Sequence, residues 1–460
     1  MTASSPTLTA PFPDDFLWGA ATSAYQVEGS PLADGAGPSN WHRFSHTPGK
    51  VRDGNTGDVA CDHYRRYPED VGIMRDLGLT AYRFSLSWSR LLPEGRGVAN
   101  PRGLDFYSRL IDLLLASGIQ PLITLYHWDL PAALDDLGGW TNPDCVHWFA
   151  DYAALAFRAF GDRVSSWATL NEPWVVVDAG YVHGVHPPGL ESLPEAAAAS
   201  HHLLCAHGAA VSRYRDFGRG RIGLVVNLEP KHPASEKPED RAATARAEAY
   251  MNRQFLDPVL KGQCPEELTA VFGEAWKDGC LRDLDLIRQP IDFLGINYYT
   301  RAVVRNDPAA IPTQSRAVFQ VGSEHTETGW EVYPDGLYEI LCWVRERYGE
   351  IPLYVTENGA ALADPAPDPG GVVEDPRRVE YYRRHLEAAH RAIGKGVDLR
   401  GYFAWSLLDN FEWQHGYSKR FGIVQVDFTT QRRTLKRSAL FYREVIRTRG
   451  AALSAGAGRA

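Results

Sequence analysis

The sequence predicts a single-domain α/β protein built as a (β/α)8, or TIM, barrel whose long βα loops form an active-site pocket. Short apolar, β-branched runs alternate with amphipathic stretches of helical length along 460 residues, as in βα units around a parallel sheet. Two of the runs end on a glutamate, where such barrels carry their chemistry. One barrel with insertions accounts for the whole length, and no shift in composition marks a second domain.

Eight runs are predicted to form the barrel strands, because each is apolar and is followed by turn-forming residues. They are residues 17–22, 81–86, 120–125, 165–171, 221–227, 293–297, 353–357 and 401–406. Helices are predicted between them at 63–77, 101–117, 143–160, 196–217, 334–348 and 377–394, and several begin near a proline, which suits the first turn.

Four segments are too long for simple βα loops: 28–61, 173–194, 300–329 and 358–375. Each follows a predicted strand, so all four should lie on one face of the barrel and wall a pocket. The small, polar residues 1–13 are predicted to form a flexible arm, and 451–460 a flexible tail, on either side of a barrel domain at 14–450.

Composition narrows the classes of partner. A net charge of −9 gives no basic surface, which argues against nucleic acid and anionic membranes and favours a small neutral substrate. The six cysteines show no CxxC pair, so we expect buried free thiols and no zinc site. The first residues lack the charged and apolar regions of a secretion signal, and no run of 18 apolar residues occurs, which predicts a cytoplasmic protein.

The candidate chemistry lies at the ends of the fourth and seventh predicted strands. Glu172 stands in WATLNEP (167–173) and Glu357 in LYVTENG (353–359). In a closed barrel these two strand ends face each other across the mouth. Paired carboxyl groups about 5 to 5.5 Å apart serve a retaining glycosidase, and about 6.5 to 9.5 Å an inverting one, a choice that spacing along the chain leaves open.

Two carboxyl groups that share one reaction need different pKa values, which the surroundings must provide. Arg83, in the second predicted strand, and the hydroxyl of Tyr299 are expected to favour the ionised form of Glu357. Glu172 would then hold the proton. Its neighbour Asn171 could bind the sugar 2-hydroxyl.

The stretches TLNEP (169–173) and VTENG (355–359) resemble the two signature motifs of glycoside hydrolase family 1, the β-glucosidase family. The resemblance runs from residue 16 to about 442, through LWGAATSAYQVEG (17–29), YHWDLP (126–131), GINYY (295–299) and WSLLDNFEW (405–413). It implies a retaining β-glycosidase with Glu172 as acid/base and Glu357 as nucleophile, and neither a cofactor nor a metal in the reaction.

The resemblance also implies roles for the remaining candidate residues. They are Gln26, His127, Trp128, Asn171, Glu412 and Trp413 for the nonreducing sugar, Trp405 as its stacking platform, Asn297 and Tyr299 beside the nucleophile, Trp174 and Trp330 near the leaving group, and Phe421 as a further substrate-binding residue. The implied substrates are β-glucosides such as cellobiose and aryl β-glucosides, with β-fucosides, β-galactosides and transfer to other sugars as extensions. Oligomeric state is left open.

Three alternatives stay open at this stage. The 6-phospho-β-glycosidases of the same family usually have a small residue in place of Glu412 and a tyrosine in place of Phe421, although Lys419 matches their phosphate-binding lysine. A sugar-binding barrel without catalysis would more often lack one of the two glutamates. His183 and His186 could be metal ligands, but their loop is rich in proline and offers no third ligand.

Overall fold

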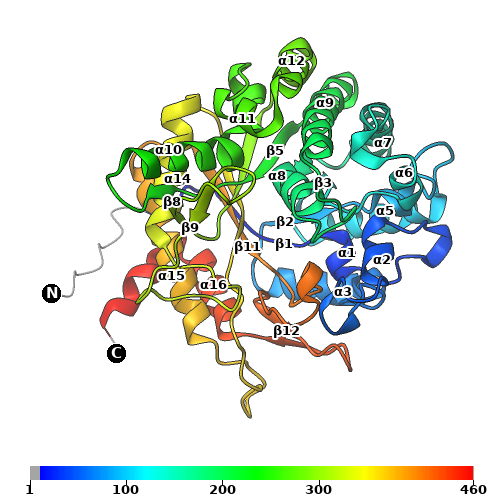
Figure 1. The fold of residues 1–460 in the computed structure, drawn as a ribbon. Coiled ribbons are helices and arrows are strands. Elements are labelled where there is room, and N and C mark those ends of the chain that lie inside the picture. The colour runs from blue at the N-terminus through cyan, green and yellow to red at the C-terminus, as the bar shows by residue number, and fades with distance from the viewer. Residues whose placement is uncertain (1–10, 459–460) are drawn as a thin grey trace.

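The computed structural model describes residues 11–458 and contains eight parallel strands closed into a barrel, with helices around it (Figure 1). Around the barrel the order is β1-β11-β10-β7-β5-β4-β3-β2, so each strand lies beside the barrel strand that precedes it in the chain. The strands are Leu17–Ala21 (β1), Ala81–Ser85 (β2), Gln120–Tyr126 (β3), Ser166–Asn171 (β4), Arg221–Asn227 (β5), Phe293–Asn297 (β7), Leu353–Asn358 (β10) and Leu399–Trp405 (β11). The predicted (β/α)8 barrel is confirmed.

All six predicted helices are present, with starts that differ by at most three residues from the prediction. They are His63–Asp76 (α3), Pro101–Ala116 (α5), Cys145–Phe160 (α7), Leu193–Phe217 (α9), Pro334–Tyr348 (α14) and Pro376–Gly394 (α15). The other α-helices of the described residues are Ala24–Val27 (α1), Asn40–Ser45 (α2), Trp88–Leu91 (α4), Ala132–Asp135 (α6), Pro173–Val177 (α8), Pro238–Glu248 (α10), Thr269–Phe272 (α11), Glu274–Arg282 (α12), Leu284–Ile287 (α13) and Arg437–Arg447 (α16).

Three of the four long segments carry short elements that the sequence did not predict. Segment 28–61 contains α2, and segment 173–194 contains α8 followed by a π-helix at Asp178–Val182. Segment 300–329 contributes β8 (Ala302–Asn306) and β9 (Ser315–Ala317) to a small sheet with β6 (Lys231–Pro233), next to α10 in Figure 1. A second small sheet pairs β12 (Val424–Val426) with β13 (Arg433–Leu435). Elements of three to six residues contain too few helical turns or strand alternations to be recognised from the sequence.

Side chains alternate between the inside and the outside of the barrel. Along β2, Tyr82 and Phe84 belong to the large core between strands and helices, whereas Ala81 belongs to a separate apolar cluster that includes Leu122, Phe293 and other barrel residues. Because side chains alternate along a strand, Arg83 points the same way as Ala81, into the barrel. A buried cation inside the barrel needs anionic and polar partners there.

The predicted flexible arm is wrong at Phe12, and residues 1–10 lie outside the described part of the chain. Phe12 is buried, packs on Phe16 and Trp18 with ring centroids 4.8 and 4.9 Å apart, and donates its backbone N–H to the carbonyl of Arg449. The predicted flexible tail is likewise wrong at its start, because Ala451–Gly458 is a 3-10 helix with Leu453 buried. Composition suggested mobility, but single apolar side chains are enough to anchor both ends.

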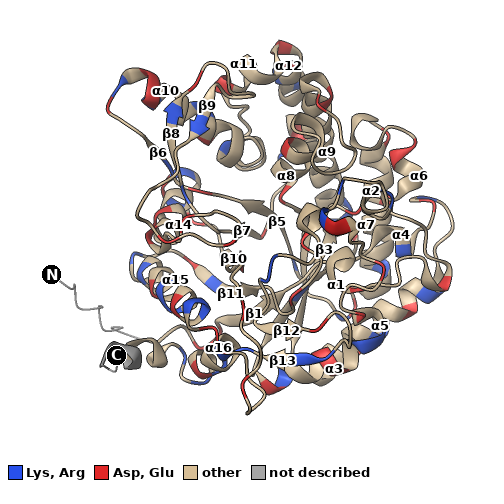
Figure 2. Ribbon diagram, turned by 60° about the horizontal axis from the view of Figure 1, so that its bottom comes forward, with Lys and Arg blue, Asp and Glu red and all other residues tan. Residues whose placement is uncertain are grey.

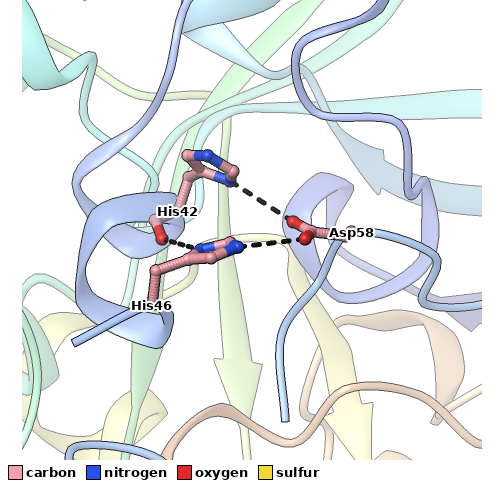
Figure 3. A group of neighbouring side chains, drawn as sticks. All are labelled: His42, His46 and Asp58. Atoms are coloured by element: carbon pink, nitrogen blue, oxygen red, sulfur yellow. Dashed lines mark hydrogen bonds and ion pairs between the residues drawn. The ribbon is translucent and has the colours of Figure 1, made fainter. Parts of the chain in front are cut away.

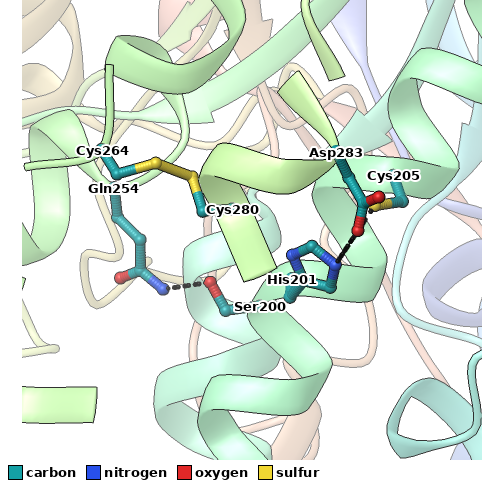
Figure 4. Close-up of a disulfide and its surroundings, with 7 residues drawn as sticks. All are labelled: Ser200, His201, Cys205, Gln254, Cys264, Cys280 and Asp283. Atoms are coloured by element: carbon teal, nitrogen blue, oxygen red, sulfur yellow. Dashed lines mark hydrogen bonds and ion pairs between the residues drawn. A yellow bond between two sulfur atoms is a disulfide. The ribbon is translucent and has the colours of Figure 1, made fainter. Parts of the chain in front are cut away.

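Two of the six cysteines form a disulfide, Cys264–Cys280, which corrects the prediction that all are free (Figure 4). The chain turns back through α11 and α12 and so brings the two residues together. No short sequence motif predicts this pairing. Cys61, Cys145 and Cys205 are buried free thiols, as predicted, and Cys342 is partly exposed.

None of the helices within residues 11–458 is long and apolar enough to cross a membrane. Acidic and basic residues are interspersed over outer helices such as α3, α5 and α15 (Figure 2). The cytoplasmic location stays a prediction.

Candidate active site

The two predicted glutamates lie at the carboxyl ends of β4 and β10. Glu172 directly follows β4 and begins α8, with Pro173 in the first turn of that helix. Glu357 is the penultimate residue of β10, in register with Asn297 at the end of β7. Both carboxylate side chains are almost fully buried, at 5% and 3% exposure. Pro173 follows Glu172, and Asn358-Gly359 follow Glu357, so each strand ends at or next to its glutamate, at the mouth of the barrel.

A continuous set of hydrogen bonds joins the two glutamates. Arg83 donates from Nη1 to Glu357 Oε1 at 2.6 Å and from Nη2 to Asn171 Oδ1 at 2.6 Å. Asn297 donates from Nδ2 to the same Asn171 oxygen at 3.0 Å and to Glu172 Oε1 at 2.7 Å. Tyr299 donates its hydroxyl to Glu357 Oε2. The predicted contacts of Arg83 and Tyr299 with Glu357 are therefore present.

The surroundings of the two carboxyl groups are unequal. Burial, and then the negative charge of Glu357, raise the pKa of Glu172 to about 8, although the hydrogen bond from Asn297 and the charge of Arg83 oppose the rise. Burial also raises the pKa of Glu357, but Arg83 and the hydroxyl of Tyr299 oppose that rise. Glu357 accepts from the guanidinium of Arg83 and the phenol of Tyr299, whereas Glu172 accepts from the amide of Asn297. This difference favours a proton on Glu172 and a negative charge on Glu357.

His127 presents a free donor on the other side of Asn171. Its Nε2 lies 3.1 Å from Asn171 Nδ2, which donates, so the ring proton is on Nδ1. That Nδ1 is buried and has no hydrogen-bond partner within the described residues. Burial, and then the charge of Arg83, lower the pKa of His127 well below its usual range, so the ring is neutral. A buried unpaired donor is costly unless a ligand accepts from it.

Gln26 and Glu412 form a polar corner beside the pocket. Gln26 donates from Nε2 to Glu412 Oε2 at 3.3 Å and to the carbonyl of Phe411 at 2.9 Å, which ties α1 to the loop after β11. Burial, with a contribution from the charge of Glu357, raises the pKa of Glu412 to about 8. The corner therefore offers a carboxyl group and an amide to neighbouring hydroxyl groups.

Aromatic rings surround these polar groups. Trp405 stacks on His127 with centroids 5.9 Å apart, and Trp413 packs on Trp128 at 4.7 Å. Tyr299 packs on Trp330, which also contacts Phe421. Flat apolar rings next to hydrogen-bonding groups suit a sugar, which has apolar faces and polar edges.

Part of this set of residues borders a cavity of about 350 Å³. Eight predicted residues line it: Trp128, Glu172, Trp174, Asn297, Tyr299, Trp330, Glu412 and Trp413. The other predicted residues, Gln26, Arg83, His127, Asn171, Glu357, Trp405 and Phe421, contact those eight or one another. The indole N–H of Trp174 is buried without a partner in the described part of the chain, so a second donor is available to a ligand.

The sequence reasoning missed several residues of the cavity wall, among them Asn227, Met251, His186 and Gln414. Asn227 is the last residue of β5 and could have been found by the strand-end rule that identified Glu172. His186 and His183 do not form a metal pair, because His186 bonds to Gln414 at 2.6 Å and His183 lies beside Asp178 at 3.5 Å.

Three site residues hold left-handed backbone conformations that non-glycine residues rarely adopt. They are Trp128, Glu172 and Trp413, with φ of 80°, 45° and 49°. Each such residue costs about 1–3 kcal/mol and persists where the surroundings impose it, commonly at binding sites.

The barrel carries two buried glutamates with unequal surroundings at the carboxyl ends of β4 and β10, next to a cavity of aromatic rings and hydrogen-bonding groups. This arrangement is that of a glycosidase site. The comparisons give the family. The model of glycosyl hydrolase family 1 matches residues 8–451. The chain therefore belongs to glycosyl hydrolase family 1, and it is a glycoside hydrolase.

Individual relatives agree along nearly the whole chain. The chain is 50% identical over 441 residues to beta-glucosidase A of Thermotoga maritima, covering 95% of this chain and 98% of that one. It is 44% identical to a bifunctional beta-D-glucosidase/beta-D-fucosidase of Bifidobacterium breve, covering 95% and 99%. The solved structure of the Thermotoga maritima family 1 β-glucosidase superposes with a TM-score of 0.93 at 50% identity, covering 95% and 98%. Its complex with glucoimidazole also gives 0.93, at 49% identity and 96% and 99% coverage.

The buried ion pair of Arg83 with Glu357 yields a stability prediction. Arg83→Met leaves a buried carboxylate without its cation, which should lower the free energy of unfolding by about 3–5 kcal/mol at neutral pH. Since the loss comes from the charge on Glu357, it should shrink at lower pH, where that carboxyl group is protonated. Urea unfolding at about pH 7 and pH 5 measures both effects.

Two variants control this measurement. Arg75→Met removes an exposed ion pair with Asp76 and should change stability by less than about 1 kcal/mol. Glu357→Gln in the Arg83→Met background removes the uncompensated charge and should recover part of the loss. If Arg83→Met were no less stable than Arg75→Met, the ion pair would not have the role assigned to it.

Proposed function

We propose that the protein is a retaining β-glucosidase that removes terminal nonreducing β-D-glucosyl residues through a covalent glycosyl-enzyme. The observation that carries the proposal is the unequal environment of two glutamates, Glu172 in the cavity wall and Glu357 bonded to the cavity residue Tyr299. The names of the relatives, β-glucosidases and a β-glucosidase/β-fucosidase, support glucose as the preferred sugar and β-fucosides as further substrates.

In the first step Glu357 attacks the anomeric carbon while Glu172 donates its proton to the glycosidic oxygen. The bond from the anomeric carbon to that oxygen breaks, the leaving group departs as an alcohol, and an ester to Glu357 forms. Arg83 and Tyr299 keep Glu357 ionised until it reacts. Their hydrogen bonds also hold its two oxygens in position.

The second step uses the change in charge that the first step produces. Once Glu357 is esterified its negative charge is gone, and with it one cause of the raised pKa of Glu172. Glu172 then suits the role of base and takes a proton from water, which attacks the anomeric carbon and releases the sugar. A second sugar in place of water would give transglycosylation.

The polar groups around the cavity suit recognition of the sugar. We assign the hydroxyl contacts to Gln26, Glu412, Asn171 and His127, whose Nδ1–H has no partner among the described residues, and the stacking face to Trp405. We assign Trp128 and Trp413 to the nonreducing end and Trp174 and Trp330 to the leaving group, with Phe421 behind them in contact with Trp330. Cellobiose and aryl β-glucosides are the proposed substrates, with β-galactosides as weaker ones, which gives the enzyme a place in cellulose breakdown.

The charge of the cavity disfavours 6-phosphorylated sugars. The residues that line it in the described chain include Glu172, Glu229 and Glu412 and no lysine or arginine. Lys419, the remaining candidate for a phosphate contact, donates to the backbone carbonyl of Glu327. A phosphate dianion would meet carboxyl groups and no cation.

A panel of p-nitrophenyl β-glycosides tests the proposal. We expect kcat/KM to be highest for glucoside and fucoside, lower for galactoside and xyloside, and near zero for glucoside 6-phosphate. Glu357→Gln should lower kcat for the glucoside by about 10⁴-fold or more, because it removes the nucleophile. Glu229→Gln, at another cavity glutamate that pairs with Lys231, is the matched control and should retain activity within about tenfold. A preference for the phosphorylated sugar, or no turnover of any, would contradict the proposal.

The pKa of Glu172 predicts the alkaline limb of the pH profile. The acid must carry its proton in the first step, so kcat/KM should be retained below a pH of about 8 and fall about tenfold per pH unit above it. With a 2,4-dinitrophenyl glucoside, whose leaving group needs no acid, Glu172→Gln should stay active and lose this limb. The pKa of Glu412 is also raised to about 8. If Glu172→Gln kept the alkaline limb, the limb would belong to another group such as Glu412 and not to Glu172.

A further inference from the structure

The first long loop brings two histidines and an aspartate together outside the cavity (Figure 3). His42 lies in α2 and His46 directly follows it, four residues on, so their side chains lie one turn apart on one face. His42 Nδ1 lies 3.4 Å from Asp58 Oδ1, and His46 Nε2 lies 3.0 Å from Asp58 Oδ2. One nitrogen or oxygen atom from each of the three residues lies within 4.8 Å of the others.

The hydrogen bonds of His46 leave a ligand atom facing the aspartate. His46 Nδ1 lies 2.7 Å from the backbone carbonyl of His42, and since a carbonyl only accepts, Nδ1 carries the hydrogen. In the neutral ring, Nε2 therefore directs its lone pair at an Asp58 oxygen 3.0 Å away. Two acceptors that face each other at this distance repel unless a positive group lies between them.

His42 supplies a second unsatisfied nitrogen. Its Nδ1 is buried and makes no hydrogen bond with the part of the chain that the structure describes, although Asp58 is close. An imidazole whose other N–H is held by a backbone carbonyl, as in His46, is the usual orientation of a metal-binding histidine.

We propose that His42, His46 and Asp58 bind one divalent ion of the zinc class, with water as the fourth ligand. Two imidazoles and one carboxylate suit Zn²⁺, Co²⁺ or Ni²⁺, whereas Ca²⁺ and Mg²⁺ prefer sites made of oxygen. Bonds of about 2.0–2.2 Å in a tetrahedron separate ligand atoms by roughly 3.3–3.5 Å. His42 Nδ1 lies 3.4 Å from one Asp58 oxygen and His46 Nε2 lies 3.0 Å from the other, close to this spacing, and the three ligand atoms lie within 4.8 Å of one another before any ion draws them together. The side chains of His46 and Asp58 are 42% and 44% exposed, which leaves room for the ion to enter and for the water.

The position indicates a structural role for the ion. Trp41, next to His42, packs on Trp413 of the cavity wall with centroids 4.5 Å apart. Near Asp58, the carbonyl of Thr56 accepts from the Tyr417 hydroxyl at 2.7 Å. An ion would therefore join α2 to residues 55–58, and both of these segments pack against residues 413–417. The ion itself would not contact the reacting atoms.

A second group, His201, Cys205 and Asp283, also has three potential ligands within 4.8 Å (Figure 4). There His201 Nε2 is already bonded to Asp283 at 2.8 Å, and burial raises the pKa of the Cys205 thiol to about 12. This group carries no proposal, but the test must separate it from the first.

The test is Zn²⁺ binding by isothermal titration calorimetry, on full-length protein that has been treated with chelator and desalted. We expect the wild type to bind one equivalent and to melt at a higher temperature with Zn²⁺ than with Mg²⁺. His46→Gln and Asp58→Asn should each weaken this binding at least about tenfold and abolish the rise in melting temperature. His201→Gln and His147→Gln, the latter at an exposed histidine of α7, should bind as the wild type does.

Several outcomes would overturn the proposal. They are no Zn²⁺ binding by the wild type, unchanged Zn²⁺ binding by His46→Gln and Asp58→Asn, or loss of the bound Zn²⁺ equivalent in His201→Gln. Because the side chains of His46 and Asp58 are partly exposed, both variants should fold, and their glucoside turnover in chelator should match that of the wild type. That comparison also separates failure of the ion site from failure of the proposed function. Four-coordinate Co²⁺ absorbs visibly, so a Co²⁺ spectrum absent from the two variants gives an independent readout.

Discussion

The ion pair of Arg83 with Glu357 inside the barrel is the constraint on which the rest of the site depends. A buried guanidinium is costly unless its donors find acceptors and its charge finds a partner. Arg83 donates to Glu357, Asn171 and Thr124, which lie on three further strands. The strands that carry the partners of Arg83 also carry the polar groups of the site. The arrangement of the site therefore depends on closure of the barrel.

The same ion pair makes the protonation of the two glutamates different. It supplies positive charge to Glu357 and leaves Glu172 in a buried environment with one amide donor, so two residues of the same type acquire different proton affinities. Asn297 bonds to Glu172 and, through Asn171, to the arginine, which couples the two carboxyl groups through a fixed path. His127 Nδ1 and the indole N–H of Trp174, which have no partner within residues 11–458, add two donors that a sugar could satisfy.

Much of this architecture could be predicted from the sequence, for physical reasons. A buried parallel strand is a continuous apolar run, so its end shows where a polar residue appears, as at Glu172 and Glu357. The small β6-β8-β9 sheet has no such signal, because its strands are short and partly exposed. The Cys264–Cys280 disulfide and the burial of Phe12 depend on where the chain returns in space, which local pattern does not encode. Individual roles in the sugar site came from the resemblance to a family, since His127 alone reads as an ordinary core histidine.

The central claim is that Glu357 forms a covalent bond to the sugar while Glu172 handles the proton. The most direct measurement is mass spectrometry of the protein after incubation with 2-deoxy-2-fluoro-β-D-glucosyl fluoride, in which fluorine slows release of the intermediate more than its formation. The account predicts one fluoroglucosyl group per chain, on the peptide that contains Glu357, and none on a Glu357→Gln control. A label on Glu172, or no label while α-glucose appears as the first product of turnover, would contradict it.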